Sequence, residues 1–122
     1  MTKTISAKTN LMYIGEVAKQ TGLTIKAIRF YEAKGLIPAP KRLGRYRIYS
    51  QADIELLLLI KEAKDLGISL SALSKVIKID DNGVNWQVIK QFLCEVKTQL
   101  KHDILLLEKK ITMIDQCIKG IA

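Results

Sequence analysis

The segment from Tyr13 to Tyr49 constrains the fold of this chain more than any other. It holds two short helical patterns joined by a turn at Gly22, and the second pattern ends at Gly35. Glycine suits the left-handed conformation that stops a helix. Thr24 can cap the second helix, because its hydroxyl oxygen accepts from backbone N–H groups two or three residues later. The segment therefore predicts two short helices around a tight turn.

A basic, extended stretch follows the two helical patterns. Pro38 pushes the residue before it out of the α region, so the chain is expected to become extended there. Gly44 is the expected hairpin turn, and residues 45 to 49 alternate as in a short strand. This stretch predicts a small β wing beside the helices.

The positive charge of the chain lies at one end. Residues 1–50 hold ten Lys and Arg against two acids, Glu16 and Glu32, which accounts for the whole net charge of +8. The remaining 72 residues hold ten basic and ten acidic side chains and sum to zero. An excess confined to one end is typical of a surface that binds nucleic-acid phosphates, whereas a uniformly basic chain would indicate little.

Length and composition bound the remaining possibilities. A chain of 122 residues is about one domain. Residues 1–11 are polar and aperiodic, so we expect a disordered leader rather than a signal peptide. The longest apolar run, Leu56 to Ile60, is far below the roughly 18 residues of a membrane span, and we expect a cytoplasmic protein. Two cysteines, Cys94 and Cys117, are too few for a disulfide framework or a zinc site, so no metal and no cofactor is expected.

The sequence after residue 50 predicts mainly helices. Ser50 and Asp53 form a plausible capping box for a helix that ends before Gly67, and Ser69 can cap a shorter helix over 70–78. Residues 80–83 are expected to form a turn. The organisation is then a head over 12–80 and one long helix within 85–122.

The long helix carries an apolar seam with steps of three and four residues, typical of a coiled coil. The seam positions are Leu93, Val96, Leu100, Ile104, Leu107, Ile111, Ile114 and Ile118. So small a head cannot bury eight such positions. We therefore expect a partner helix, most simply from a second copy of the chain.

Polar side chains of the second helix and the wing are candidates for contacts with DNA. Hydroxyl, ammonium, guanidinium and phenol groups on a helix suit a major groove and its phosphates, and wing cations suit the backbone. Two alternatives remain: Arg29 pairs with Glu32 three residues later, or the wing is an idle solvated basic face.

The segment IGEVAKQTGLTIKAIRFYEAKGLI, followed by GRYRIYSQADIELLLLIKEAKDLGISL, resembles the MerR family of bacterial transcriptional regulators over about residues 12–78. The order of IRFYE, GLI-P, YR-Y and LGISL carries the resemblance. It implies an all-α fold with a small β wing, in which a winged helix-turn-helix head is followed by a dimerisation helix in an antiparallel coiled coil. It further implies a homodimer on a palindromic operator, in a promoter whose elements are spaced too far apart. Family activators underwind and bend that DNA, so that RNA polymerase can engage.

The resemblance also implies site residues by position. The recognition-helix positions that match are Thr24, Lys26, Arg29 and Tyr31. The wing positions that match are Lys41, Arg42, Arg45, Tyr46 and Arg47.

Metal-sensing members place a cysteine or serine at the start of the dimerisation helix and a cysteine pair in a loop after it. This sequence departs from that pattern, so we expect Cys94 and Cys117 to be helix-face residues. They are too far apart on one helix to pair with each other. A contact between Cys94 and Cys117 of two antiparallel chains stays open.

No nucleophile and base pair, paired carboxylates or phosphate-cradling glycine loop is present, so an enzyme is not expected. The alternatives to a regulator are an architectural, excisionase-like DNA-bending protein and a coiled-coil adaptor that binds a ligand or protein. The run Leu56 to Ile60 either thickens the core or, as we favour, presents Leu56, Leu58 and Leu59 to a partner's long helix.

Overall fold

The computed structural model describes residues 12–80 and 83–121. The chain divides into two compact units, a head that ends at Val84 and a second unit that begins at Asn85. The leader predicted at 1–11 lies outside the described residues.

The predicted helix-turn-helix is confirmed as α1 (Ile14–Thr21) and α2 (Ile25–Ala33). Gly22 ends α1 with φ +77°, in the left-handed region that favours glycine. A Cβ at this position would lie 2.8 Å from Nζ of Lys61, which donates to the carbonyl oxygen of Thr21. The predicted cap is also present, because Oγ1 of Thr24 accepts from the N–H of Ala27 at 3.0 Å.

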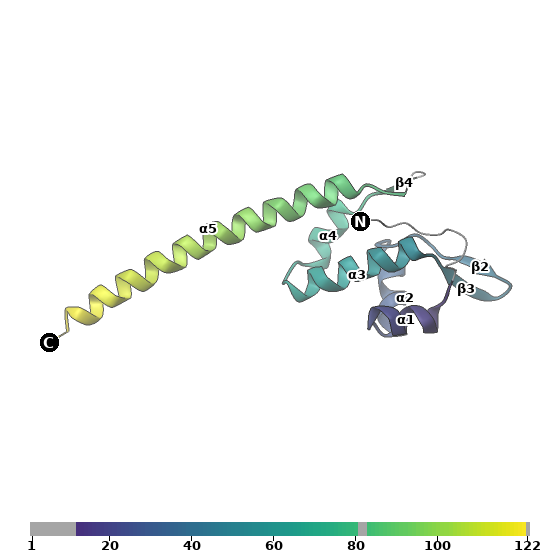
Figure 1. Cartoon of the computed structure of the whole chain (residues 1–122), viewed down its shortest axis with the longest axis horizontal. Helices are drawn as coiled ribbons and strands as arrows, with labels where there is room; N and C mark the ends of the chain where they lie inside the picture. Colours follow the sequence, from purple (N-terminus) through teal and green to yellow (C-terminus); the bar gives the residue numbers. More distant parts are fainter. Residues whose placement is uncertain (1–11, 81–82, 122) are drawn as a thin grey trace. The chain divides into compact units, whose positions relative to one another are not determined.

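The predicted wing consists of β2 (Lys41–Leu43) and β3 (Tyr46–Tyr49), an antiparallel hairpin that turns at Gly44 with φ +64°. Figure 1 shows this hairpin extending from one end of the head. A third strand, β1 (Met12–Tyr13), pairs antiparallel with the other edge of β3, giving the order β1-β3-β2. The sequence did not predict β1, because a two-residue strand has no periodicity to detect.

Two more helices complete the head, α3 (Gln51–Asp65) and α4 (Leu70–Val76). The capping box of α3 is confirmed: Asp53 accepts from the N–H of Ser50 at 2.9 Å and donates its own N–H to Ser50 Oγ at 3.2 Å. α4 ends two residues earlier than predicted. A small hairpin of β4 (Ile79–Asp80) and β5 (Gly83–Val84) occupies the place of the predicted turn, of which residues 81 and 82 are not described.

The head has its own apolar core, built where α1 contacts α2, α3 and β3. Its fully buried side chains include Val17, Ile28, Leu36, Ile37, Tyr49, Ile54, Leu57, Ile60 and Leu73. Leu56 is also buried, with 1% of its surface exposed. The interpretation that presented Leu56 to a partner helix is therefore wrong for this residue, because its own chain already covers it; Leu58 is 36% exposed.

The second unit contains one helix, α5 (Trp86–Lys119), of 34 residues. Oδ1 of Asn85 caps it by accepting from the backbone N–H groups of Gln87 and Val88. Figure 1 shows α5 as a single uninterrupted helix, as the sequence predicts. Among the described residues, no helix is long and apolar enough to cross a membrane.

Candidate nucleic-acid interface

The exposed surface of α2 carries most of the predicted recognition residues. Thr24, Lys26 and Arg29 are exposed. Tyr31 is not: it is 3% exposed, and it lies three residues after the buried Ile28, on the core face of α2. The prediction that the Tyr31 phenol faces a major groove is therefore wrong.

Phe30 is a surface residue of α2 that the sequence reasoning missed. It is 45% exposed, its ring contacts the Tyr31 ring edge-on, and Nζ of Lys34 lies 5.5 Å from the ring centroid. The signal was available, because Phe30 lies next to Arg29, off the face that carries Ile28. The Lys34 ammonium over the Phe30 ring adds both a positive charge and an apolar ring to the exposed surface of α2.

The wing presents its cations as predicted. Lys41, Arg42, Arg45 and Tyr46 are exposed, and Arg47 is half-buried. The Tyr46 ring packs edge-to-face against Tyr13 of β1, with ring centroids 5.5 Å apart. β1 therefore fixes the position of a wing aromatic, a role that the sequence did not indicate for Tyr13.

Glu32 connects α2 to the wing. Its Oε1 accepts from the Tyr49 hydroxyl at 3.0 Å, and its Oε2 lies 3.4 Å from Nε of Arg47. Burial, followed by the hydrogen bond to Glu32, raises the pKa of Tyr49 to about 12, so this phenol keeps its proton and donates. The alternative in which Glu32 pairs with Arg29 is not realised among the described residues, since both carboxylate oxygens face β3.

A small cavity opens where β1, α2 and the wing meet. Its volume is about 130 Å³, and it is lined by Tyr13, Ile14, Arg29, Arg45, Tyr46 and Arg47. Three arginines thus line this space, from α2, the hairpin turn and β3, together with two tyrosines and no acidic residue. Such a set of donors suits an anion.

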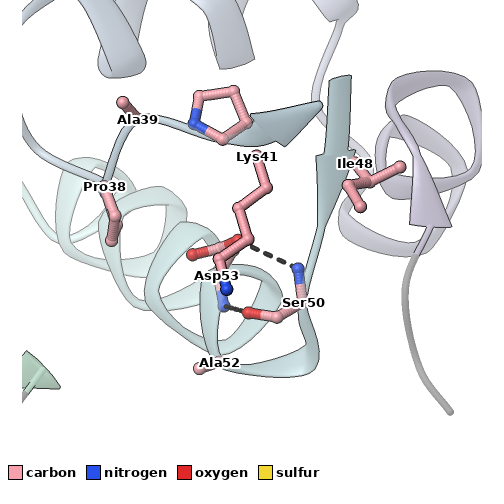
Figure 2. A pocket seen from close by; sticks show the side chains of 8 residues that line it. Pro38, Ala39, Lys41, Ile48, Ser50, Ala52 and Asp53 are labelled. Atoms are coloured by element: carbon pink, nitrogen blue, oxygen red, sulfur yellow. Dashed lines mark hydrogen bonds between the residues drawn. The ribbon is translucent and has the colours of Figure 1, made fainter. Parts of the chain in front are cut away.

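A second, larger cavity lies between the proline-containing loop and the start of α3, as Figure 2 shows. Its volume is about 300 Å³, and its lining is mostly apolar. The lining residues are Pro38, Ala39, Pro40, Lys41, Ile48, Ser50, Ala52 and Asp53. Burial raises the pKa of Asp53, while the hydrogen bonds with Ser50 oppose that shift. One cation and one carboxylate already used as a helix cap give this cavity no evident chemistry.

The cysteines do not form a site in one chain. Both are exposed on α5 and have free thiols. Their 23-residue separation corresponds to about 35 Å along a helix and about 140° around it. The described residues contain no group of three or more His, Cys, Asp or Glu that could hold a metal ion.

Comparison with known proteins agrees with this geometry. Residues 12–79 match the model of the MerR HTH family regulatory protein. The chain is 39% identical over 112 residues to the HTH-type transcriptional regulator YfmP of Bacillus subtilis, which covers 82% of this chain and 80% of that protein.

Two solved structures share the fold. One is a MerR family transcriptional regulator from Listeria monocytogenes, with a TM-score of 0.64, 23% identity, and coverage of 89% of this chain and 84% of that one. The other is a MerR family regulator lacking the sensor domain, bound to promoter DNA. It has a TM-score of 0.58, 22% identity, and coverage of 86% and 79%.

Proposed function

Because the chain belongs to the MerR family of helix-turn-helix regulatory proteins, we propose that it acts as a homodimer on an inverted-repeat operator inside a promoter. It is a DNA-binding transcriptional regulator, and members of this family are regulators rather than enzymes. We place it in the cytoplasm, with the promoter DNA that it binds.

The exposure of the α5 seam carries the proposal of a dimer. From Leu100 to Ile118 the six seam residues are between 53% and 60% exposed in one chain, whereas Leu93 and Val96 are half-buried. Burying apolar surface stabilises association by about 25 cal/mol per Å². A second α5 is the simplest partner that matches a seam with this spacing.

The charges beside the seam favour an antiparallel pair. When two seams overlap fully, Leu93 of one copy lies level with Ile118 of the other, and Lys97 then lies close to the level of Asp115, on the same side of the seam. Asp103 and Lys110 form a second opposite-charge pair on the other side. A parallel pair would instead bring Asp103 near Glu108, which repels it. Neither Lys97 nor Lys110 is ion-paired within the described part of one chain.

The same alignment argues against a contact between Cys94 of one copy and Cys117 of the other. Cys94 and Cys117 would lie level with each other in two antiparallel copies, but on opposite sides of the seam, because they are about 140° apart around the helix. A disulfide needs Cβ atoms about 4 Å apart. We therefore do not assign an intersubunit disulfide to this pair.

A dimer presents two heads related by a two-fold axis, which matches an inverted repeat. In each head, α2 would enter the major groove and the wing would lie along the backbone. We infer that the bound dimer bends and underwinds the promoter, and that RNA polymerase responds indirectly, to the deformed DNA.

Leu107→Asp tests the dimer, and Leu105→Asp is its control. Leu107 lies on the seam, whereas Leu105 is 65% exposed and lies on the opposite side of α5. An unpaired carboxylate in the apolar interface costs several kcal/mol, so Leu107→Asp should be monomeric by light scattering. It should also lose affinity for an operator that the wild-type protein selects from random DNA. Leu105→Asp should stay dimeric and bind normally. A dimeric Leu107→Asp protein with full affinity would show that the seam is not the interface.

A further inference from the structure

We propose that the cavity between β1, α2 and the wing is a phosphate socket, which binds one phosphodiester group of the DNA backbone, and that Glu32 is its positioning residue. The socket is the cavity lined by Tyr13, Ile14, Arg29, Arg45, Tyr46 and Arg47. This inference rests on the proposed function, because it requires the head to face DNA.

The chemistry of the lining selects a phosphate. Guanidinium groups present N–H donors in a fixed fork that matches phosphate oxygens, and tyrosine hydroxyls add neutral donors. Three arginines from three segments of the head line one space. A volume of about 130 Å³ is roughly four times the share of one water molecule in the liquid, which suits a group of a few heavy atoms.

Arg47 is the member whose orientation the fold controls. Its Nε atom is buried and makes no hydrogen bond of good geometry, although it lies 3.4 Å from Glu32 Oε2. The attraction is therefore mainly between charges, and it holds the Nε side of the guanidinium toward Glu32. A guanidinium has five N–H donors, so its terminal nitrogens remain available to the cavity that Arg47 lines.

Glu32 holds Arg47 from outside the cavity. Its side chain is 15% exposed and does not line the cavity, and its other oxygen is engaged by the Tyr49 hydroxyl. The carboxylate therefore faces β3 and acts on the phosphate through Arg47. Removing an acidic side chain near DNA usually strengthens binding, because the acid repels phosphates. Removing the Glu32 charge should instead weaken binding, because Arg47 would lose the group that orients it.

The first experiment replaces each operator phosphate in turn by a neutral methylphosphonate, at symmetric positions in both half-sites. At the socket phosphate, wild-type affinity should fall about tenfold or more, as expected for lost hydrogen bonds to charged groups. Arg45→Ala should lose a similar factor on unmodified DNA and nothing further on DNA neutralised at that position. Lys41→Ala is the control, because Lys41 lines the other cavity. The fold-loss in affinity from Lys41→Ala and the fold-loss from the neutralised phosphate should multiply, as expected for independent contacts.

The second experiment compares Glu32→Gln with Glu16→Gln, an exposed acid in the first turn of α1. Both changes raise the net charge by one, and Gln keeps an oxygen that accepts from Tyr49. Glu16→Gln should leave affinity unchanged or tighten it. Glu32→Gln should weaken binding several-fold on operator and random DNA alike, and this loss should vanish on DNA neutralised at the socket phosphate. A purely structural role for Glu32 would leave the loss intact there.

The outcomes separate the socket from the proposed function. Suppose that the wild-type dimer binds its operator, but that the affinity loss from Arg45→Ala adds to the loss from neutralising a phosphate at every position tested. The socket is then wrong, while the proposed function stands. If the protein binds no DNA at all, the proposed function fails first. A titration with inorganic phosphate tests whether the cavity binds a free phosphate instead. Millimolar phosphate binding that Arg45→Ala abolishes, together with DNA affinity losses that stay additive, would assign the cavity to a free phosphate and overturn the proposal.

Discussion

At the scale of single residues, burial decides which polar groups can meet DNA. Tyr31 and Tyr46 are both aromatic residues in basic surroundings, yet Tyr31 is 3% and Tyr46 61% exposed. Tyrosine has an apolar ring and a polar tip, so either environment is compatible with its chemistry. Only the side of the element on which it lies determines its role.

Tyr31→Phe tests the reassignment of Tyr31 to the core. The buried ring should be retained, so operator affinity and thermal stability should both stay close to wild type. Tyr31→Ala should instead cost about 3 to 5 kcal/mol of unfolding free energy, as for other large aromatic truncations in a core. Loss of DNA affinity in a stably folded Tyr31→Phe protein would restore the phenol to the binding surface.

Tyr49→Phe should destabilise the head by about 1.5 to 3 kcal/mol at neutral pH, because it removes a hydrogen bond to a charged carboxylate. The pKa of Tyr49 is raised from 10.0 to about 12 in the folded protein. The stabilisation from its proton is thus fully present below pH 10 and is lost as the pH rises toward 12. Denaturant unfolding of both proteins between pH 9 and 12 checks this, and the deficit of Tyr49→Phe should shrink over that range.

Lys26→Ala tests base readout from the start of α2, where the exposed ammonium can reach a base edge. It should cost more on operator than on random DNA, by about 1 to 3 kcal/mol per base contact. Mobility shifts on both DNAs measure the difference. Equal losses on the two DNAs would assign Lys26 to the backbone instead.

At the scale of elements, helix starts are the most locally determined features of the chain. The caps at Thr24, Ser50, Ser69 and Asn85 each accept from an N–H no more than three residues away. Such contacts need no tertiary partner, so a local sequence is sufficient to predict them. Short strands behave differently, since β1 exists only because β3 lies beside it.

Ser50→Ala tests the importance of the capping box for α3. The change removes the oxygen that accepts from the Asp53 N–H and should cost about 1 kcal/mol of unfolding free energy. It also removes one of the hydrogen bonds that oppose the burial-raised pKa of Asp53, so that pKa should rise further. Calorimetry gives the first quantity and NMR titration of the carboxyl gives the second. Ser50→Thr keeps the acceptor and should change neither.

At the scale of the whole molecule, the positive charge is concentrated in the first part of the head. The basic excess of residues 1–50 suits phosphate binding, whereas α5 holds six basic and four acidic side chains, a near balance that suits self-association. Two heads joined by one interface would double every backbone contact, so a change in one residue removes two contacts from the complex.

The salt dependence of DNA binding measures that doubling. About four basic phosphate contacts per head would neutralise about eight phosphates per dimer, so log K should fall against log salt with a slope near −7. Arg45→Ala should weaken operator and random DNA by similar factors and make the slope shallower by about two. A change of about one would indicate that only one head engages the DNA.

The sequence by itself determined the features that depend on near neighbours: α1 and α2 with their turn, the caps, the wing hairpin, the charge asymmetry and the period of the α5 seam. Each depends on residues within a few positions of one another, or on a repeat that one helix displays alone. The tertiary structure decided which of two chemically plausible environments each amphipathic residue occupies. Tyr31 and Leu56 are buried only because other segments cover them. In the same way, Glu32 pairs with Arg47 of β3 and not with its near neighbour Arg29, and Tyr13 and Arg45 line one cavity. Each of these features requires segments far apart in sequence to pack together. Periodicity marks an apolar face, but packing against a specific neighbour selects the partner.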